Sequence, residues 1–499
     1  MSTGTSGASI GRNTFWNFLG VAAPVPAALI AIPMLVHGLG EERFGLLTIA
    51  WAVMGYFSVF DFGLSRATTR SLAQILHAQD SHAAQRVFWS STAAHGALGL
   101  LGGLILFAAA PSLENILAVA PSLHDETVTV FRVLALSVPV ILLTSVARGL
   151  LEAVHRFDLV NVVKLPASLV TYLGPVGALA FTDRLPPIVL VILTARIAVL
   201  LTYAIQCVMV MPSIRKFQRP RLLDVGALAR VGGWLTVGTI LTPTLVTIDR
   251  FVIGSVVSVA AVAAYAAPYE VVTKLWMFSG SLLGVLFPQF AILSENRPAL
   301  QNLYWRALGW LFACTTPFAL LIVAFAPEFF TLWLGPEIAR EGISVAQWLT
   351  VGVLINVVAQ VPYTALQATD HPDIAGKLQL LQLPFYIVGA WLAAVQFGVV
   401  GVAIAWTIRA AVDAVLMFAA VRSRLEISLA SRQVAQVVAH LSTTTALMIW
   451  CWIVVPHLAG TLAVKIPLVC VAVGGFAWLA LRGADVGGIR AALMLKMDV

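Results

Sequence analysis

Long uncharged apolar stretches alternate with short charged segments along almost the whole chain. The first of them, Asn13–Gly40, runs for 28 residues without a formal charge. A helix that crosses the hydrocarbon core of a bilayer needs about 20 such residues, whereas the core of a signal peptide is shorter. This stretch therefore predicts a retained membrane span. The same pattern predicts fourteen spans, at residues 14–37, 44–63, 87–110, 128–147, 165–182, 186–211, 231–254, 261–290, 303–326, 343–367, 375–396, 399–421, 434–455 and 460–481.

The spans at 375–396 and 399–421 are separated by very little polar sequence. Leu378–Ile408 contains no formal charge, and only Gln396–Gly398 and Gly401 interrupt it. Glycine beside a polar residue is typical of a tight turn. We therefore expect two helices with a turn at this point rather than one long helix.

An internal repeat relates the two halves of the chain. Leu151–Asp158 matches Leu366–Asp373 at an offset of 215 residues, and Thr194–Val199 matches Thr407–Val412 at an offset of 213. Each unit contains six spans, which is an even number, so both units cross the membrane in the same orientation. This arrangement predicts a pseudo-twofold axis along the membrane normal, as in transporters built from parallel repeats.

The span pattern and the repeat together predict an all-α polytopic membrane protein. It has two pseudo-symmetric six-helix bundles and two extra C-terminal helices. The expected organisation is a cytoplasmic tail at 1–12, an N-terminal six-helix lobe at 13–211, a basic cytoplasmic linker at 212–230, a C-terminal six-helix lobe at 231–421, two additional transmembrane helices at 422–482 and a cytoplasmic tail at 483–499.

Composition and charge support this interpretation. Only 11% of the 499 residues are charged and 60% are hydrophobic, which excludes an ordinary soluble protein. Of the 30 Lys and Arg, 21 lie on the side of the N-terminus and three on the opposite side, so both termini are expected in the cytoplasm. The basic inner face explains the net charge of +7 through contact with anionic lipid, without a nucleic-acid partner.

The sequence carries no signal for a cofactor or a metal. Cys207, Cys314, Cys451 and Cys470 lie in apolar runs without Cys-x-x-Cys spacing, and the histidines are scattered. No phosphate loop of the Gly-x-x-x-x-Gly-Lys type occurs, which argues against ATP hydrolysis by this chain. Short loops also leave no room for a soluble catalytic domain, so we expect a protein that is not an enzyme.

Charged residues inside spans are the candidates for function, because burial of a charge at mid-bilayer costs at least about 2.5–3.5 kcal/mol. Arg196 and Arg409 stand at equivalent mid-span positions of the two repeats. A wet, basic cavity lined by such residues would suit an anionic cargo such as a phosphate or pyrophosphate headgroup. The alternative is that the charges form ion pairs within the bundles and only fix the packing. The candidate substrate-binding residues are Arg196, Lys274, Arg409 and Arg250.

Acidic residues near these cations are candidates for coupling to protons or sodium. Glu270 and Lys274 share an i, i+4 spacing, as do Arg409 and Asp413, while Asp249 adjoins Arg250 near the outer end of its span. Each acidic group has a basic neighbour that could simply neutralise it. The candidates for ion coupling are Asp249, Glu270 and Asp413.

Several segments resemble the polysaccharide exporter (O-antigen flippase) family of the multidrug/oligosaccharidyl-lipid/polysaccharide exporter superfamily. They are Leu39–Gly45, Tyr56–Arg70, Ile248–Gly254 with Tyr265, and Gly398–Trp406. The loop Gln367–Pro372 departs from the Gly-Arg step that the family often has there.

This resemblance implies an alternating-access exporter of the bacterial inner membrane. Its substrate would be an undecaprenyl-pyrophosphate-linked oligosaccharide (an O-antigen, exopolysaccharide or capsule repeat unit), which it would move from the cytoplasmic to the periplasmic leaflet. The implied partners are that lipid-linked oligosaccharide, membrane lipids and other polysaccharide assembly proteins.

The alternatives to a flippase for lipid-linked oligosaccharide are a drug exporter, a membrane-embedded polymerase or ligase, and a lipid II exporter. A drug exporter of the same superfamily often has an acidic cation site on its first span, but Thr14–His37 contains no Asp or Glu. A membrane-embedded polymerase or ligase would need a long outer loop with acid and base residues, but the loops around 111–127 and 327–342 are only about 16 residues long. The sequence does not exclude a lipid II exporter, because lipid II flippases also have fourteen spans and a basic cavity.

Overall fold

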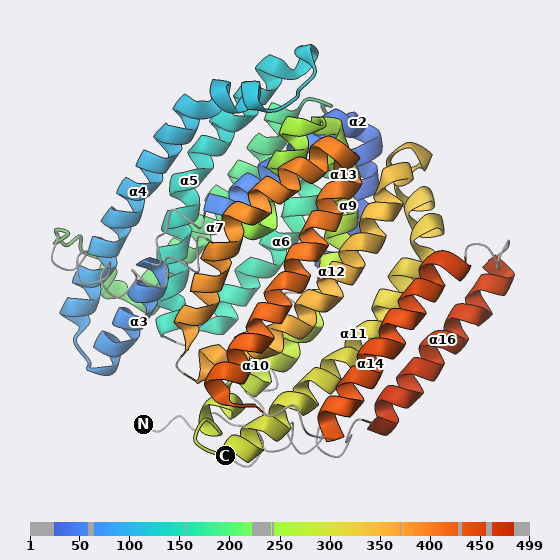
Figure 1. The fold of residues 1–499 in the computed structure, drawn as a ribbon. Coiled ribbons are helices and arrows are strands. Elements are labelled where there is room, and N and C mark those ends of the chain that lie inside the picture. Colours follow the sequence, from blue (N-terminus) through green and yellow to red (C-terminus); the bar gives the residue numbers. More distant parts are fainter. Residues whose placement is uncertain are drawn as a thin grey trace. The chain divides into compact units, whose positions relative to one another are not determined.

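The computed structural model describes residues 24–57, 64–154, 156–221, 241, 244–369, 371–427, 432–455 and 462–483. Within these residues all regular elements are helices (Figure 1), and nine of them are long and apolar enough to cross a membrane. This confirms the predicted all-α polytopic membrane fold. The total of fourteen spans stays a prediction, because several of them fall partly outside the described residues.

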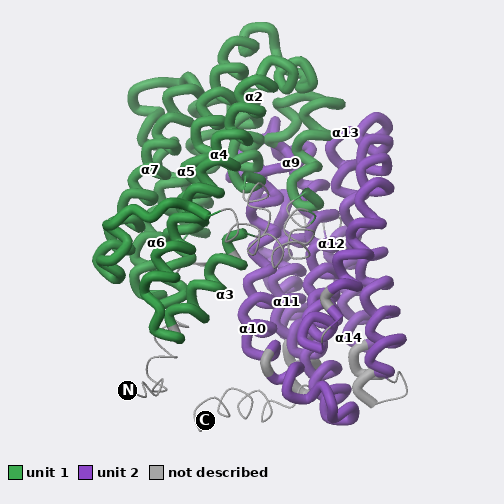
Figure 2. The backbone as a smooth tube through the Cα atoms, turned by 90° about the vertical axis from the view of Figure 1, so that its left-hand side faces the viewer, with its two compact units in different colours: residues 1–263 green, residues 264–499 purple. Residues whose placement is uncertain are grey.

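The chain divides into two compact units, residues 1–263 and 264–499, which Figure 2 colours separately. The predicted domain boundaries, including a linker at 212–230, stay predictions. Unit 1 contains α2 (Pro24–Tyr56), α3 (Leu64–His77), α4 (Ser81–Ile116), η2 (Pro121–Leu123), α5 (His124–Ala153), α6 (Phe157–Leu179), α7 (Leu185–Val210) and η3 (Pro212–Arg215). Helix α9 (Val259–Val272) crosses the division. Unit 2 contains η4 (Thr273–Leu275), α10 (Trp276–Ile292), α11 (Arg297–Leu334), α12 (Pro336–Ala368), α13 (Pro372–Leu425), α14 (Arg432–Ile449), η5 (Trp450–Val454) and α16 (Leu462–Gly483).

Helix α13 is broken at Gly398, where the backbone has φ 59°. Glycine adopts this left-handed region without the steric cost that a Cβ atom brings. The two halves then lie side by side, because the amide Nε2 of Gln382 donates to Oδ1 of Asp413 at 2.9 Å. Figure 1 shows the same reversal as two orange legs of α13. The predicted turn between 375–396 and 399–421 is therefore present.

Helix α3 is a short helix that the span pattern does not predict. Its sequence is amphipathic, and Leu72 on its apolar side is fully buried. Its polar residues bond to the neighbouring helices: Ser65 Oγ donates to Ser145 Oγ of α5 at 2.7 Å, and Thr68 Oγ1 lies 3.0 Å from Ser91 Oγ of α4. Satisfied hydroxyls of this kind let a polar helix pack inside a membrane bundle.

Small residues bring α4 and α5 close together in unit 1. A Cβ atom added at Gly99 would lie 2.5 Å from Cα of Pro139, and one added at Gly103 would lie 2.7 Å from the carbonyl oxygen of Ala135. Only glycine therefore permits this approach of the two backbones.

A single carboxylate joins three helices at one end of unit 1. Glu126, in the first turn of α5, accepts hydrogen bonds from the guanidinium of Arg43 in α2 at 3.2 Å and from the backbone N–H of Leu185 at 2.6 Å. Leu185 is the first residue of α7, so Glu126 also satisfies one of the free N–H groups of that helix terminus. Asp183 adds a second contact to Arg43 at 3.3 Å.

In unit 2 the two C-terminal helices pack on α11. The ammonium of Lys465 in α16 lies 2.6 Å from Oε1 of Glu328, and the side chain of this lysine is only 2% exposed. Thr316 of α11 and Thr444 of α14 lie 3.4 Å apart through their hydroxyl oxygens. An ion pair and a hydroxyl contact therefore attach both helices to the bundle.

Candidate functional site

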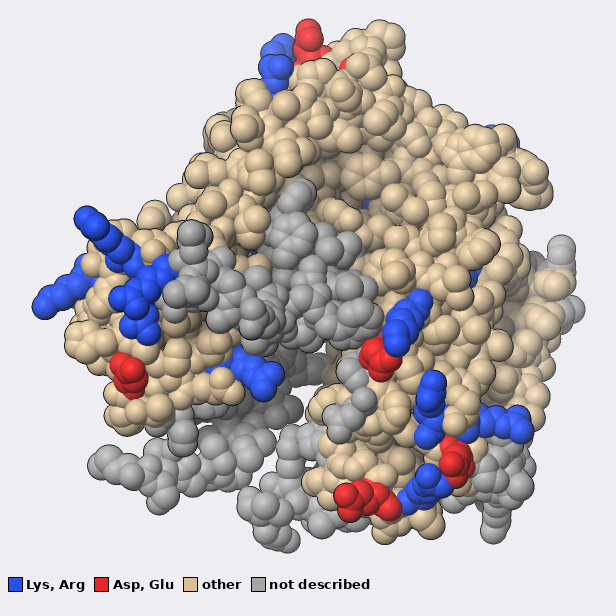
Figure 3. All heavy atoms as spheres, turned by 60° about the vertical axis from the view of Figure 1, so that its left-hand side comes forward, with Lys and Arg blue, Asp and Glu red and all other residues tan. Residues whose placement is uncertain are grey.

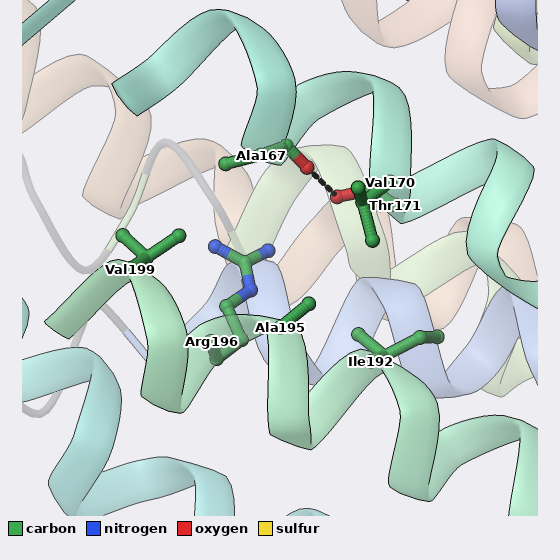
Figure 4. Close-up of a pocket in the computed structure, with 7 residues that line it drawn as sticks. All are labelled: Ala167, Val170, Thr171, Ile192, Ala195, Arg196 and Val199. Atoms are coloured by element: carbon green, nitrogen blue, oxygen red, sulfur yellow. Dashed lines mark hydrogen bonds between the residues drawn. The ribbon is translucent and has the colours of Figure 1, made fainter. Parts of the chain in front are cut away.

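Arg196 lies near the middle of α7 and points toward α6 (Figure 4). It is about 16 Å along the helix from Leu185, close to half the thickness of a bilayer core. Within the described part of the chain the structure gives Arg196 no hydrogen bond or ion pair. The side chain borders a small, partly open pocket, with room for about one water molecule, that is otherwise lined by Ala167, Val170, Thr171, Ile192, Ala195 and Val199.

Arg409 lies in the second half of α13 and is held by two aromatic rings. Its guanidinium carbon is 5.2 Å from the ring centroid of Tyr386 and 5.4 Å from that of Trp406. Its buried Nε has no hydrogen-bond partner among the residues that the structure describes. Each cation–π contact is worth about 0.5–2 kcal/mol, depending on how far the pair is desolvated. The aromatic faces thus stabilise the charge of Arg409, and no carboxylate of the described segments forms an ion pair with it.

The two arginines occupy similar places in two helical hairpins, as the predicted repeat requires. Each stands on the second helix of a hairpin and faces the first helix, α6 for Arg196 and the first half of α13 for Arg409. Arg409 is about 15 Å along the helix from Val399, and Arg196 is about 16 Å along α7 from Leu185, so the two distances are nearly equal. The surroundings differ, since Arg409 meets aromatic rings and Arg196 meets mainly aliphatic side chains.

Asp413 does not form the ion pair with Arg409 that their spacing allows. Its side chain is 8% exposed, and its Oδ1 accepts the hydrogen bond from Gln382 across the hairpin. Among the described residues no ion pair joins Arg409 and Asp413. The two side chains therefore do not neutralise each other. The carboxylate has a neutral partner and the guanidinium has aromatic partners.

Glu270 and Lys274 do form an ion pair, at 3.2 Å between Oε2 and Nζ. The pair bridges a change in helix geometry, because Glu270 lies in the last turn of α9 and Lys274 lies in the 3-10 turn η4 before α10. Their side chains are 19% and 31% exposed. The structure agrees with the alternative of a local ion pair, in which the carboxylate of Glu270 balances the charge of Lys274.

Asp249 and Arg250 are buried, with exposures of 0% and 6%. An amino group of Arg250 donates to the carbonyl oxygen of Thr48 in α2 at 3.3 Å. Arg250 therefore supports the packing of α2 inside unit 1. Its role in substrate binding stays a prediction.

The sequence placed Lys465 inside a span but did not identify its partner. Glu328 is 137 positions away in the chain, and Phe325 adds a cation–π contact at 5.5 Å. Neither residue has a spacing relation to Lys465 that would have indicated the contact. Arg409 and Trp406 are different, because their i, i+3 spacing on one helix could have revealed half of the aromatic site.

Comparison with known proteins adds a family to this geometry. Residues 10–294 match the family described as "Polysaccharide biosynthesis protein". The chain belongs to this family. It is also 27% identical over 415 residues to the "Putative O-antigen transporter" of Shigella flexneri, across 82% of this chain and 97% of that protein. These matches confirm the resemblance to the O-antigen flippase family.

Two solved structures share the fold of this chain. "Lipid II flippase MurJ, inward closed conformation" superposes with a TM-score of 0.72 at 11% identity, over 93% of this chain and 98% of that one. An inward-facing multidrug resistance MATE family transporter superposes with a TM-score of 0.68 at 18% identity, over 81% and 94% of the two chains. At these identities the likeness establishes a multi-pass transporter fold and no more.

Proposed function

We propose that this protein is a flippase that exports an undecaprenyl-pyrophosphate-linked oligosaccharide by alternating access, and that it is not an enzyme. It acts in the bacterial inner membrane with both termini in the cytoplasm. Family membership, similarity to an O-antigen transporter and the two arginines at mid-membrane depth support this proposal. A membrane potential that is negative inside favours outward movement of an anion by about 2.3 kcal/mol per charge per 100 mV.

The observation that carries the proposal is the state of Arg409. The guanidinium is held by two rings, and its Nε lacks a hydrogen-bond partner within the described part of the chain. Such a group can bind an anionic oxygen without first breaking a salt bridge. We assign the pyrophosphate contact to Arg409 and Arg196, because neither has a carboxylate partner among the described residues. Lys274, which is paired with Glu270, plays a smaller part, and Arg250 supports α2.

Asp413 is our preferred candidate for ion coupling. It is buried and bonded to a neutral amide, so its protonation would not break an ion pair among the described residues. Glu270 would lose its bond to Lys274 if it took up a proton. Asp249, fully buried next to Arg250, is the third candidate.

The test measures transfer of lipid-linked oligosaccharide across proteoliposome membranes that contain equal amounts of folded protein. We expect Arg409→Gln to reduce the transfer rate roughly 10- to 100-fold, because a hydrogen bond to a charged group is worth about 1.5–3 kcal/mol. Arg409→Lys should retain more activity, although lysine cannot form a bidentate contact. Arg132→Gln is the matched control, since Arg132 is an exposed arginine of α5 whose guanidinium lies 5.2 Å from the ring of Phe107.

A double change separates direct contact from charge balance. If Arg409 served only to balance Asp413, Arg409→Ala/Asp413→Ala would recover the rate that Arg409→Ala loses. Wild-type transfer by this double variant would reject the assignment of Arg409 to the substrate. Because the fold also resembles a lipid II flippase, the assay includes lipid II as a second substrate. Transfer of lipid II alone would reject the proposed glycan class.

A further inference from the structure

The segment that follows α7 is fixed to unit 1 by apolar side chains. Met211 and Ile214 are 8% and 4% exposed, and both belong to the core formed by α3, α4, α5, α6 and α7. The short helix η3 (Pro212–Arg215) begins directly after Met211 and contains Ile214. The chain therefore leaves the span and stays against the protein instead of extending into water.

Side chains of α4 also hold the backbone of this segment. Trp89 Nε1 donates to the carbonyl oxygen of Ile214 at 3.2 Å, and the amide of Gln85 donates to the carbonyl oxygen of Lys216. The backbone N–H of Arg221 donates to Ser90 Oγ at 3.0 Å. Three successive points of attachment fix the conformation of residues 214–221.

The side chains that this backbone presents are cationic and exposed. Among the described residues none of them forms an ion pair. They surround Phe217, which is 65% exposed and whose ring centroid lies 5.2 Å from that of Trp89. Figure 3 shows Lys and Arg gathered in patches and separated by broad uncharged surface. The four cations of the segment are Arg215, Lys216, Arg219 and Arg221.

We propose that residues 214–221 form a binding site for the headgroups of anionic phospholipids. The segment begins at the end of the apolar helix α7, which places it at the depth of the lipid phosphates. Clusters of Lys and Arg directly beside a span attract anionic lipid, at about a fivefold gain in affinity for each cation. Phe217 supplies an apolar group that enters the acyl-chain boundary between the cations. Because α4 already fixes the backbone, little chain entropy is lost on binding.

The test uses the full-length protein in detergent with added dioctanoyl phosphatidylglycerol or dioctanoyl phosphatidylcholine. The thermal unfolding midpoint as a function of lipid concentration gives an apparent affinity for each lipid. We expect the wild type to prefer phosphatidylglycerol and Arg219→Gln/Arg221→Gln to bind it about 30-fold more weakly. The control Arg184→Gln/Arg340→Gln removes two exposed cations elsewhere and should change the affinity less than about threefold.

Other outcomes decide against the proposal. Equal affinity for the two lipids would overturn it, as would an equal loss of affinity in the control variant. Competition by inorganic pyrophosphate at the same concentration as the lipid would assign the cations to a free anion instead of a lipid surface. Phe217→Ala keeps all four charges and should weaken phosphatidylglycerol binding about fivefold if the ring enters the lipid. The site would also be rejected if Phe217→Ala and Arg219→Gln/Arg221→Gln each bound phosphatidylglycerol with the affinity of the wild type.

Discussion

The ion pair between Lys465 and Glu328 should contribute measurably to the stability of unit 2. Lys465 is 2% exposed and Glu328 is 37% exposed, with 2.6 Å between nitrogen and oxygen. Breaking a fully buried pair by removing one partner costs about 3–5 kcal/mol, because the other charge is left without compensation. Since more than a third of the Glu328 side chain is exposed, solvent screens part of this cost, and we expect about 2–3 kcal/mol for Lys465→Met.

The assay is equilibrium unfolding of the purified protein in mixed micelles with increasing sodium dodecyl sulfate. The single variants Lys465→Met and Glu328→Gln and their double variant form a cycle, whose coupling free energy should be about 2 kcal/mol. Arg297→Met is the control, because Arg297 and Glu426 form an ion pair with exposures of 64% and 62%. Such a surface pair is worth roughly 0–1 kcal/mol. Additive losses in the Lys465 cycle would refute the reasoning.

Three shorter predictions follow from the geometry. Gly352→Leu should destabilise unit 2 by about 1–3 kcal/mol in the same unfolding assay, since a Cβ atom there lies 2.7 Å from the ring of Trp406; an unchanged stability would show that the ring can move freely. Gly398→Ala should cost about 1–3 kcal/mol from backbone strain alone, because φ is 59° and ψ is −143° and no described atom lies within 4 Å of the added Cβ, whereas Gly389→Ala in the same helix should not destabilise. In a variant without cysteines, single cysteines at Ser122 and Glu337 should react with an impermeant thiol reagent outside intact cells and one at Pro220 should not; the reverse pattern would invert the proposed orientation.

The sequence predicted those features of the fold that depend on neighbouring positions. Span length is set by the thickness of the bilayer, so uncharged stretches predicted the long apolar helices. Gln396–Gly398 predicted the turn in α13 because glycine was the only residue there that tolerates a left-handed backbone. The ion pair of Glu270 and Lys274 agrees with the alternative that their i, i+4 spacing left open.

Contacts between distant segments were not predictable in the same way. The bond from Gln382 to Asp413 joins residues 31 positions apart, and Tyr386 reaches Arg409 only because the hairpin folds back. The i, i+4 rule suggested Asp413 as the partner of Arg409, but Asp413 accepts a hydrogen bond from Gln382 and Arg409 contacts aromatic rings. Helix α3 escaped prediction because its mixed polar sequence is too short and too charged to read as a span.

The carboxylate of Glu126 also has a mechanical consequence. It holds Arg43 of α2 and the first residue of α7 at the N-terminus of α5, so separating these three helices at this end would break its hydrogen bonds to both partners. A rotation of the helices relative to one another therefore costs least when this end is the pivot. Helix α5 has 30 residues, which corresponds to a lever of about 45 Å. A rotation of about 10° around Glu126 would displace the far end of α5 by roughly 8 Å, while the hydrogen bonds of Glu126 stay intact.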